Sequence, residues 1–155
     1  MKRVFNLLVV DESGSMSIIE HQALMGINET LTTIQKMQKT HQNMEQCVTL
    51  ITFDSTHKKL FYDNVSARHA NPLKSRDYNP CGGTPLYDAI GMGIAKINAQ
   101  TTEDDSVLVT IITDGEENCS EEYDLKMIKN LIEKLKKQNW TFTFIGTDED
   151  RKSVV

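Results

Sequence analysis

Cysteine is scarce in this sequence, and its spacing excludes two common structural devices. The 155 residues include three cysteines, Cys47, Cys81 and Cys119, which lie far apart and form no CxxC pair. An odd number of widely spaced cysteines disfavours a disulfide framework or a zinc site and favours a reducing compartment. Cys81 and Cys119 fall in predicted loops that we expect to be neighbours in space. We predict two free thiols there, with a disulfide as the alternative.

Long apolar runs and an excess of positive charge are also lacking. No run approaches the ~18–20 apolar residues that a membrane span requires. The formal net charge of −5 disfavours binding to a nucleic-acid backbone. Met1-Lys2-Arg3 before a short apolar run faintly resembles a signal peptide, but Asn6 interrupts that run and Asp11 ends it, with no small-residue cleavage site. We therefore expect a cytoplasmic protein with no nucleic-acid partner and no membrane insertion.

What is present is the composition of an ordinary globular protein, with 39% hydrophobic and 25% charged residues. This length and composition predict a single domain over residues 1–155. Apolar runs rich in β-branched residues predict strands at 4–10, 47–53, 107–113 and 140–145. Apolar residues that recur every three or four positions predict helices within 17–44, 84–97 and 125–137. Strands that alternate with helices favour an α/β fold with a mostly parallel sheet and helices on both faces.

The segments between these elements have weaker signals. Residues 54–57 resemble a turn, and the short run Leu60-Phe61-Tyr62 after it predicts an antiparallel strand at the edge of the sheet. Residues 66–83 contain two prolines and a Gly-Gly pair with little periodicity, which predicts a long loop. Thr84 is a suitable N-cap for the next helix, because Pro85 fits the first helical position.

Oxygen-bearing side chains follow two of the predicted strands and the Gly-Gly loop. Asp11, Ser13 and Ser15 come after the first strand, Thr84 opens a helix, and Asp114 ends a central strand. Parallel strands bring their carboxyl ends to one edge, and a crevice forms there if the sheet reverses its winding between them. Carboxylates and hydroxyls are the ligands that a hard cation such as Mg²⁺ prefers. The pattern therefore predicts one composite metal site.

Charge balance supports a cation at this site. Two carboxylates that converge on one crevice repel each other, and one of them tends to hold a proton. A divalent cation removes that cost, while the hydroxyls add ligand oxygens without adding negative charge. Because Mg²⁺ usually keeps several waters, an Asp or Glu of a partner protein can displace one of them and bind the metal directly.

Three motifs together resemble a known family. The Asp11-x-Ser13-x-Ser15 turn, the segment 84–90 beginning Thr-Pro-Leu, and the strand end at Asp114-Gly115 resemble the metal-ion-dependent adhesion site (MIDAS) of von Willebrand factor type A domains, over roughly residues 3–147. The resemblance implies that Asp11, Ser13, Ser15, Thr84 and Asp114 bind Mg²⁺ (or Mn²⁺ or Ca²⁺). It implies an α/β fold with a Rossmann-like, doubly wound, mostly parallel sheet and one antiparallel edge strand. It also implies partner binding without catalysis.

Several alternatives accompany this interpretation. Asp11 could instead be the nucleophile of a Mg²⁺-dependent phosphotransferase resembling the haloacid dehalogenases, but that chemistry needs a general acid where this chain has Ser13. The metal could also only brace the loops. For Thr84 we expect a cap or water-mediated contact in the unliganded protein and direct coordination once a partner binds.

Two further expectations concern the surroundings of the site. We expect Glu12, Glu116 and Glu117 to be solvated rim carboxylates, with attraction of a basic rim on the partner as the sharper alternative. The family usually continues with a further helix after the last strand, and we expect residues 148–155 to begin it.

Overall fold

A five-stranded sheet forms the centre of the molecule in this computed structural model, which describes residues 2–56, 58–114 and 117–146. Its strand order is β3-β2-β1-β4-β5, and all neighbouring strands are parallel except β3, which is antiparallel to β2. The predicted mostly parallel sheet with an antiparallel edge strand is therefore confirmed. The strands are β1 (Lys2–Asp11), β2 (Met44–Phe53), β3 (Lys58–Ser66), β4 (Ser106–Ile112) and β5 (Trp140–Ile145).

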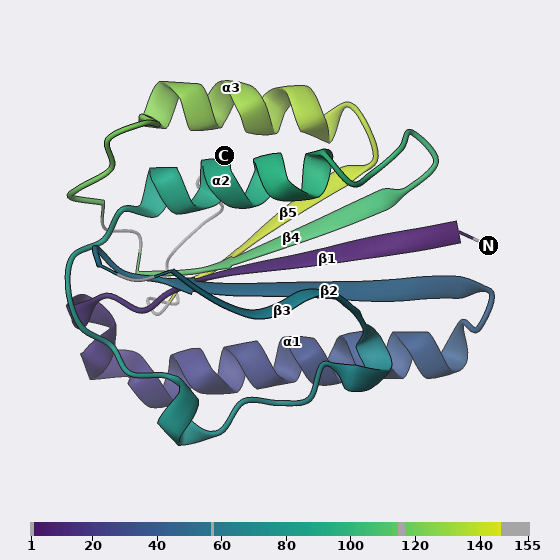
Figure 1. Ribbon diagram of the computed structural model, residues 1–155, viewed down its shortest axis with the longest axis horizontal. Helices are drawn as coiled ribbons and strands as arrows, with labels where there is room; N and C mark the ends of the chain where they lie inside the picture. The colour runs from purple at the N-terminus through teal and green to yellow at the C-terminus, as the bar shows by residue number, and fades with distance from the viewer. Residues whose placement is uncertain (1, 57, 115–116, 147–155) are drawn as a thin grey trace.

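Helices cover both faces of this sheet, as predicted. α1 (Glu20–Thr40) lies on one face, and α2 (Leu86–Asn98) and α3 (Leu125–Lys136) lie on the other (Figure 1). The chain leaves β1 toward β2 and later returns to β4 on the opposite side of β1, so the winding reverses between β1 and β4. Open α/β sheets bind their ligands at such a switch point. Within the described residues, no helix combines the length and the apolar character needed to cross a membrane.

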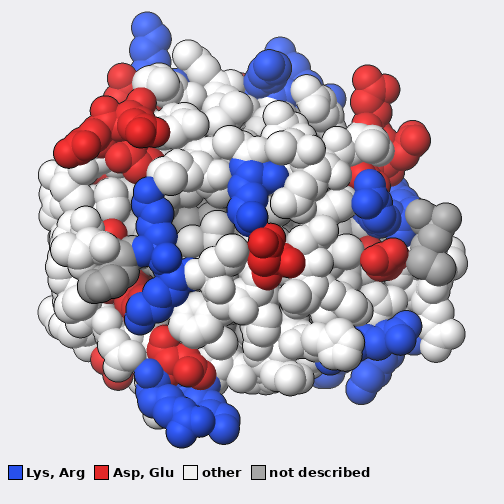
Figure 2. All heavy atoms as spheres, viewed as in Figure 1, with Lys and Arg blue, Asp and Glu red and all other residues white. Residues whose placement is uncertain are grey.

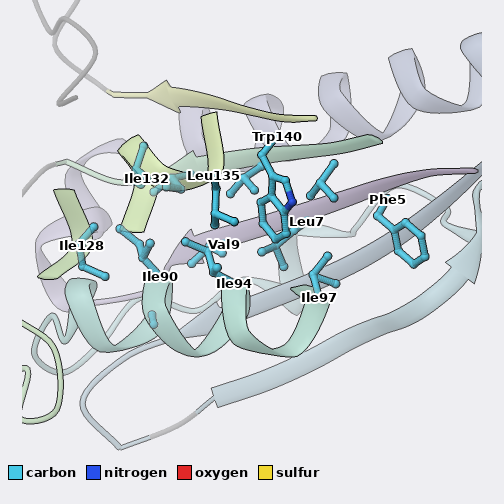
Figure 3. Close-up of a cluster of buried hydrophobic side chains, with 14 of the residues drawn as sticks. Phe5, Leu7, Val9, Ile90, Ile94, Ile97, Ile128, Ile132, Leu135 and Trp140 are labelled. Carbon is cyan, nitrogen blue, oxygen red and sulfur yellow. The ribbon is translucent and has the colours of Figure 1, made fainter. Parts of the chain in front are cut away.

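The apolar run of β1 is buried on both faces because each face meets a different helix layer. Phe5, Leu7 and Val9 point toward α2 and α3, as Figure 3 shows, where they pack among the isoleucines of those helices and Trp140. On the other face of the sheet, Leu8 and Val10 pack against the buried side chains of α1. At Gly93, a Cβ would lie 3.3 Å from side-chain atoms of Leu7 and of Val9, so a glycine there allows α2 to approach β1 closely.

The predicted loop at 66–83 is irregular but well anchored along α1. It contains two single 3₁₀ turns, at Ala67–His69 and Ser75–Asp77. The Asn28 side chain accepts the Leu73 N–H at 2.7 Å and donates to the Leu73 carbonyl at 2.9 Å. Further along, the Tyr78 hydroxyl donates to the backbone carbonyl of Asp11. These bonds hold the loop against the end of β1.

Several predicted boundaries were wrong. The helix predicted within 17–44 is present as α1, preceded by a 3₁₀ helix at Gly14–Ile19, but the strand predicted from residue 47 already begins at Met44, where it pairs with β1. The edge strand is nine residues long instead of three, since backbone pairing with β2 extends it to Ser66. His57 of the predicted turn and the expected helix start at 148–155 lie outside the described residues.

Candidate metal centre

Asp11 is the last residue of β1 and is fully buried, at 0% exposure. Its Oδ1 accepts the Ser13 N–H at 2.8 Å, and its Oδ2 accepts the Thr113 hydroxyl at 2.9 Å. Burial raises the pKa of Asp11 above its ordinary value; the bonds from Ser13 and Thr113 oppose this rise, and the nearby Asp114 carboxylate adds to it. An ionised Asp11 is therefore costly here unless a positive charge joins it.

Ser13 and Ser15 bring two hydroxyls together beside this carboxylate. Their Oγ atoms lie 3.1 Å apart, with Ser13 fully buried and Ser15 half-buried. Around an octahedral Mg²⁺ with bonds of about 2.0–2.1 Å, two adjacent ligand oxygens are separated by about 2.8–3.0 Å. The two hydroxyls thus have nearly the spacing that neighbouring ligands of such an ion require.

The Gly-Gly loop is paired with the turn that contains these serines. The Gly14 N–H donates to the Gly82 carbonyl at 2.9 Å, and the Cys81 N–H donates to the Glu12 carbonyl at 2.9 Å. Gly82 has a φ of +82°, a conformation that a residue with a side chain rarely adopts. These two bonds bring Thr84, which is 1% exposed, to the same edge as Asp11.

Thr84 does not cap α2, which corrects the sequence-based prediction. The N-cap position is Pro85, with no side-chain hydrogen bond. Instead the Thr84 N–H donates to Asn118 Oδ1 at 2.9 Å, and the Asn118 N–H donates to the Thr84 carbonyl at 3.0 Å. The prediction failed because a partner from the β4–α3 loop, distant in sequence, holds the Thr84 backbone before the helix begins.

Asp114 follows β4 and lies close enough to Asp11 for its carboxylate to raise the pKa of Asp11, as predicted for the two carboxylates.

The loop that follows Asp114 is held, from residue 117 onward, by Asp88, a buried residue of α2. The Asp88 carboxylate accepts three backbone N–H groups, from Glu121 at 2.8 Å, Glu122 at 3.0 Å and Tyr123 at 2.8 Å. Burial alone would raise the pKa of Asp88, but these three donors outweigh it and lower that pKa.

The sequence analysis did not predict that Asp88 holds the loop after Asp114. Its only sequence signal was an acidic residue within an otherwise apolar helix face. The role depends on a close approach that no local pattern reveals: at Gly91, a Cβ would lie 2.5 Å from the ring of Tyr123. A glycine at this point of α2 therefore leaves room for the loop to dock against the helix.

Two of the acidic residues expected at a solvated rim, Glu12 and Glu117, are turned inward. Glu12 is 0% exposed; its Oε2 accepts Lys59 Nζ at 3.1 Å and the Asn79 N–H at 2.6 Å. Its Oε1 is buried and has no hydrogen-bond partner within the described ranges. Glu117 is half-buried and accepts the Tyr87 N–H at 3.0 Å, so it satisfies a backbone donor in the first turn of α2. The prediction was wrong for these two residues, and Glu116 lies outside the described residues.

The donor set at this edge is built from oxygen atoms. Among the residues that the structure describes, no three His, Cys, Asp or Glu side chains gather into a metal-binding cluster. A cation here would depend on two carboxylates, those of Asp11 and Asp114, together with the neighbouring hydroxyls. That chemistry fits Mg²⁺ better than a soft metal. Cys81 and Cys119 at the same edge are free and exposed.

A hollow of about 450 Å³ lies beside this edge. It opens between the start of β3, the start of α2 and the β4–α3 loop. The residues that line it are Asp54, Ser55, Thr56, Lys58, Pro85, Asp88, Cys119 and Glu121.

Comparison with known proteins identifies one family of sequences and several solved structures with a similar fold. The von Willebrand factor type A domain family model matches residues 7–154. No curated protein sequence matches the chain. The vWF domain of the type V pili tip protein Mfa5 from Porphyromonas gingivalis is similar in structure, with a TM-score of 0.55 and 16% identity, over 81% of this chain and 43% of that one.

Pilus proteins from two other bacteria have the same fold. The pilus adhesin SpaC from Lactobacillus rhamnosus GG has a TM-score of 0.56 at 24% identity, over 76% of this chain and 15% of that one. A D319A mutant of the PilB minor pilin from Streptococcus sanguinis has a TM-score of 0.53 at 19% identity, over 74% of this chain and 30% of that one. The chain thus spans less than half the length of these proteins, and the likeness concerns the fold.

Proposed function

The chain belongs to the von Willebrand factor type A domain family, and on that premise we propose that it is a non-enzymatic module that binds a protein partner through a divalent cation. Asp11, Ser13, Ser15, Thr84 and Asp114 hold the ion, with Mg²⁺ as the first choice and Mn²⁺ or Ca²⁺ as substitutes. When bound, the ion supplies a Lewis-acidic position for an Asp or Glu of the partner.

One observation carries this proposal: a fully buried carboxylate stands beside a second carboxylate and two hydroxyls spaced like adjacent ligands. Burial and Asp114 raise the pKa of Asp11, and the Ser13 and Ser15 oxygens are 3.1 Å apart. A divalent cation offsets the cost of ionising Asp11 there. The Ser13 N–H and the Thr113 hydroxyl meanwhile orient both carboxylate oxygens.

A direct test is a titration with Mn²⁺, in which the electron paramagnetic resonance signal of the free ion measures binding. We expect Asp11→Ala and the double variant Ser13→Ala/Ser15→Ala to lose saturable binding. Ser17→Ala is the matched control, because Ser17 is an exposed serine of the same 3₁₀ turn. Equal binding by the wild type and Asp11→Ala would remove the metal from the proposal.

Partner binding needs a separate experiment. Immobilised wild-type protein in Mg²⁺ should retain specific proteins from a native extract. EDTA should release these proteins, and immobilised Asp11→Ala protein should fail to retain them. Acetate at millimolar concentration should compete, because it offers the same carboxylate. Partners that bind equally well in EDTA would favour the alternative in which the metal only braces the loops.

The phosphotransferase alternative makes a different prediction. Its general acid would occupy the position of Ser13, whose hydroxyl contacts that of Ser15 and cannot protonate a leaving group well near neutral pH. We therefore expect no hydrolysis of p-nitrophenyl phosphate or ATP above an Asp11→Ala control. Activity that depends on Asp11 would instead identify an enzyme.

A further inference from the structure

Thr84 is held from two sides by side chains of neighbouring loops. The N–H of Gly83, the residue before it, donates to Ser55 Oγ of the β2–β3 loop at 2.9 Å. The Thr84 N–H donates to Asn118 Oδ1 of the β4–α3 loop at 2.9 Å, and the Asn118 N–H donates to the Thr84 carbonyl at 3.0 Å. The two bonds with Asn118 fix the peptide groups on both sides of Thr84, and with them the direction of its side chain.

The two glycines before Thr84 allow this close contact. At Gly83, a Cβ would lie 3.0 Å from Asn118 Oδ1 and 3.3 Å from Ser55 Cβ. At Gly82, a Cβ would lie 3.0 Å from Ser55 Oγ. Side chains at these two positions would push Ser55 and Asn118 away from the loop. The Gly-Gly pair therefore leaves room for the two side chains that hold Thr84.

The segment that contains Asn118 is itself docked on the first turn of α2. Glu117 Oε1 accepts the Tyr87 N–H at 3.0 Å, and Ser120 Oγ accepts the Asp88 N–H at 3.0 Å. Glu117 Oε2 also accepts the Ser120 N–H at 3.0 Å. These residues satisfy N–H groups that the start of a helix leaves without intrahelical partners. Asn118 lies between them, so its backbone is fixed although its side chain is exposed.

We propose that Asn118 and Ser55 are positioning residues, which orient the Thr84 hydroxyl toward the cation. The inference rests on the proposed metal site, in which Thr84 is one of the ligands. Thr84 is 1% exposed, and a ligand oxygen must come within about 2.0–2.1 Å of Mg²⁺ in a near-octahedral arrangement. Loss of a residue that orients a ligand typically weakens metal binding about 10- to 100-fold.

The substitutions that test this role keep the charge of the chain. Acidic side chains gather where α3 begins, at the upper left of Figure 2. The exposed ones just before the helix are Glu121, Glu122 and Asp124. Because charges act on a cation over about 8–10 Å at ordinary salt, a changed charge here would alter metal affinity without any change of position. Neutral variants exclude that effect.

Titration with Mn²⁺ measures the effect on metal affinity. Asn118→Ala should raise the Kd about tenfold, and Ser55→Ala should raise it by a smaller factor, because Ser55 holds only the preceding peptide group. Gly83→Ala should also raise it, since the added Cβ crowds the Asn118 side chain. Asn130→Ala is the matched control, because Asn130 is an exposed asparagine on α3, and it should bind Mn²⁺ like the wild type.

A double-mutant cycle separates positioning from a general loosening of the loops. Thr84→Val removes the hydroxyl and keeps the shape, so it should weaken Mn²⁺ binding by itself. In the Thr84→Val background, Asn118→Ala should change the Kd by less than about twofold, because no hydroxyl remains to be oriented. A residue that only stabilised the loops would weaken binding by the same factor in both backgrounds.

Hydrogen exchange in EDTA tests the contacts themselves without metal. The Thr84 amide should be protected in the wild type and in Asn130→Ala, and Asn118→Ala should abolish that protection. The Gly83 amide should respond in the same way to Ser55→Ala.

The outcomes distinguish this inference from the function on which it rests. Equal Mn²⁺ affinities of the wild type and Asn118→Ala, or the same loss in both Thr84 backgrounds, would overturn the positioning role and leave the metal site standing. An unprotected Thr84 amide in the wild type would also overturn it. If the wild type showed no saturable Mn²⁺ binding, the proposed function itself would fail, and the positioning role with it.

Discussion

Two buried carboxylates lie at opposite ends of the β1–β4 strand pair, and they have different hydrogen-bond and ion-pair partners. Asp105, just before β4, is 6% exposed and receives Arg3 from the start of β1 at 2.9 and 3.2 Å. Asp11, at the end of β1, is 0% exposed and, among the described residues, forms no ion pair. It meets hydroxyl and N–H donors and a second carboxylate instead.

The pKa values of Asp105 and Asp11 shift in opposite directions, because burial raises both but only the partners of Asp105 outweigh it. Burial would raise the pKa of Asp105, but the Thr102 N–H and Arg3 outweigh it and lower that pKa. Burial raises the pKa of Asp11, and its donors do not reverse the rise. Asp105 therefore has a cation of its own, whereas the one lysine paired beside Asp11 among the described residues, Lys59, binds Glu12. The negative charge of Asp11 is the one that we propose a metal ion balances.

The largest expected effect is the response of stability to Mg²⁺. At a Mg²⁺ concentration 100 times its Kd, the wild type should gain about 2.7 kcal/mol in the free energy of unfolding. Asp11→Ala should gain nothing, whereas Asp104→Ala, an exposed control next to Asp105, should respond like the wild type. Urea denaturation with and without Mg²⁺ measures both. A loss of the response in Asp104→Ala would contradict a local site at Asp11.

Asp88 provides a third buried carboxylate, one that backbone donors satisfy. Asp88→Ala should lower the free energy of unfolding by about 2 kcal/mol, because hydrogen bonds to a charged group are lost and three N–H donors need new partners. Urea denaturation without metal checks this, with Glu122→Ala as an exposed control in the same loop. A cost below about 0.5 kcal/mol would show that water replaces the carboxylate freely.

A smaller effect should appear when Arg3 is removed. Because the pKa of folded Asp105 is lowered, its ionised form stabilises the fold above the ordinary pKa of 3.8, and this stability is lost as the pH falls through the lowered value. Arg3→Ala should therefore lower the Tm at pH 7 and have progressively less effect in acid. Thermal unfolding from pH 2 to 7 measures it; a Tm difference independent of pH would refute the pairing as its cause.

The smallest effect should be that of Asp11→Asn without metal, and its sign is opposite. A raised pKa means that the ionisation of Asp11 destabilises the fold as the pH rises from 3.8 through the raised value. Asp11→Asn keeps the shape but cannot ionise, so its Tm should exceed that of the wild type at pH 7 and match it near pH 3. Saturating Mg²⁺ should reverse the order at pH 7. A variant that is less stable at every pH would show that the carboxylate does not need a cation.

Much of the architecture follows from local sequence patterns. The apolar run of β1, with both faces buried, and the periodic isoleucines of α2 and α3 report their surroundings directly, since burial selects residue types at a fixed period. The boundaries that failed depend on pairing. β3 extends to Ser66 because β2 offers backbone partners there, although Asp63 and Asn64 are poor strand formers.

The candidate site divides in the same way. Asp11, Ser13 and Ser15 are close in sequence, so their convergence in one turn follows from the motif. The inward position of Glu12 depends on Lys59 and Asn79, which are 47 and 67 residues away. The backbone of Thr84 is held by Asn118, 34 residues away, and for that reason the prediction that Thr84 caps α2 was wrong. Contacts of this range arise only when the loops meet at the folded edge.

The pairing of the Gly-Gly loop with the first turn has a consequence for the timing of metal exchange. Two backbone bonds, from Gly14 to Gly82 and from Cys81 to Glu12, join these loops. Little conformational entropy then remains to be lost when an ion arrives. If this edge binds Mg²⁺ as proposed, we expect the slow step to be the removal of water from the ion, which dehydrates reluctantly. Exchange at this edge should therefore follow the hydration kinetics of the cation more closely than any motion of the chain.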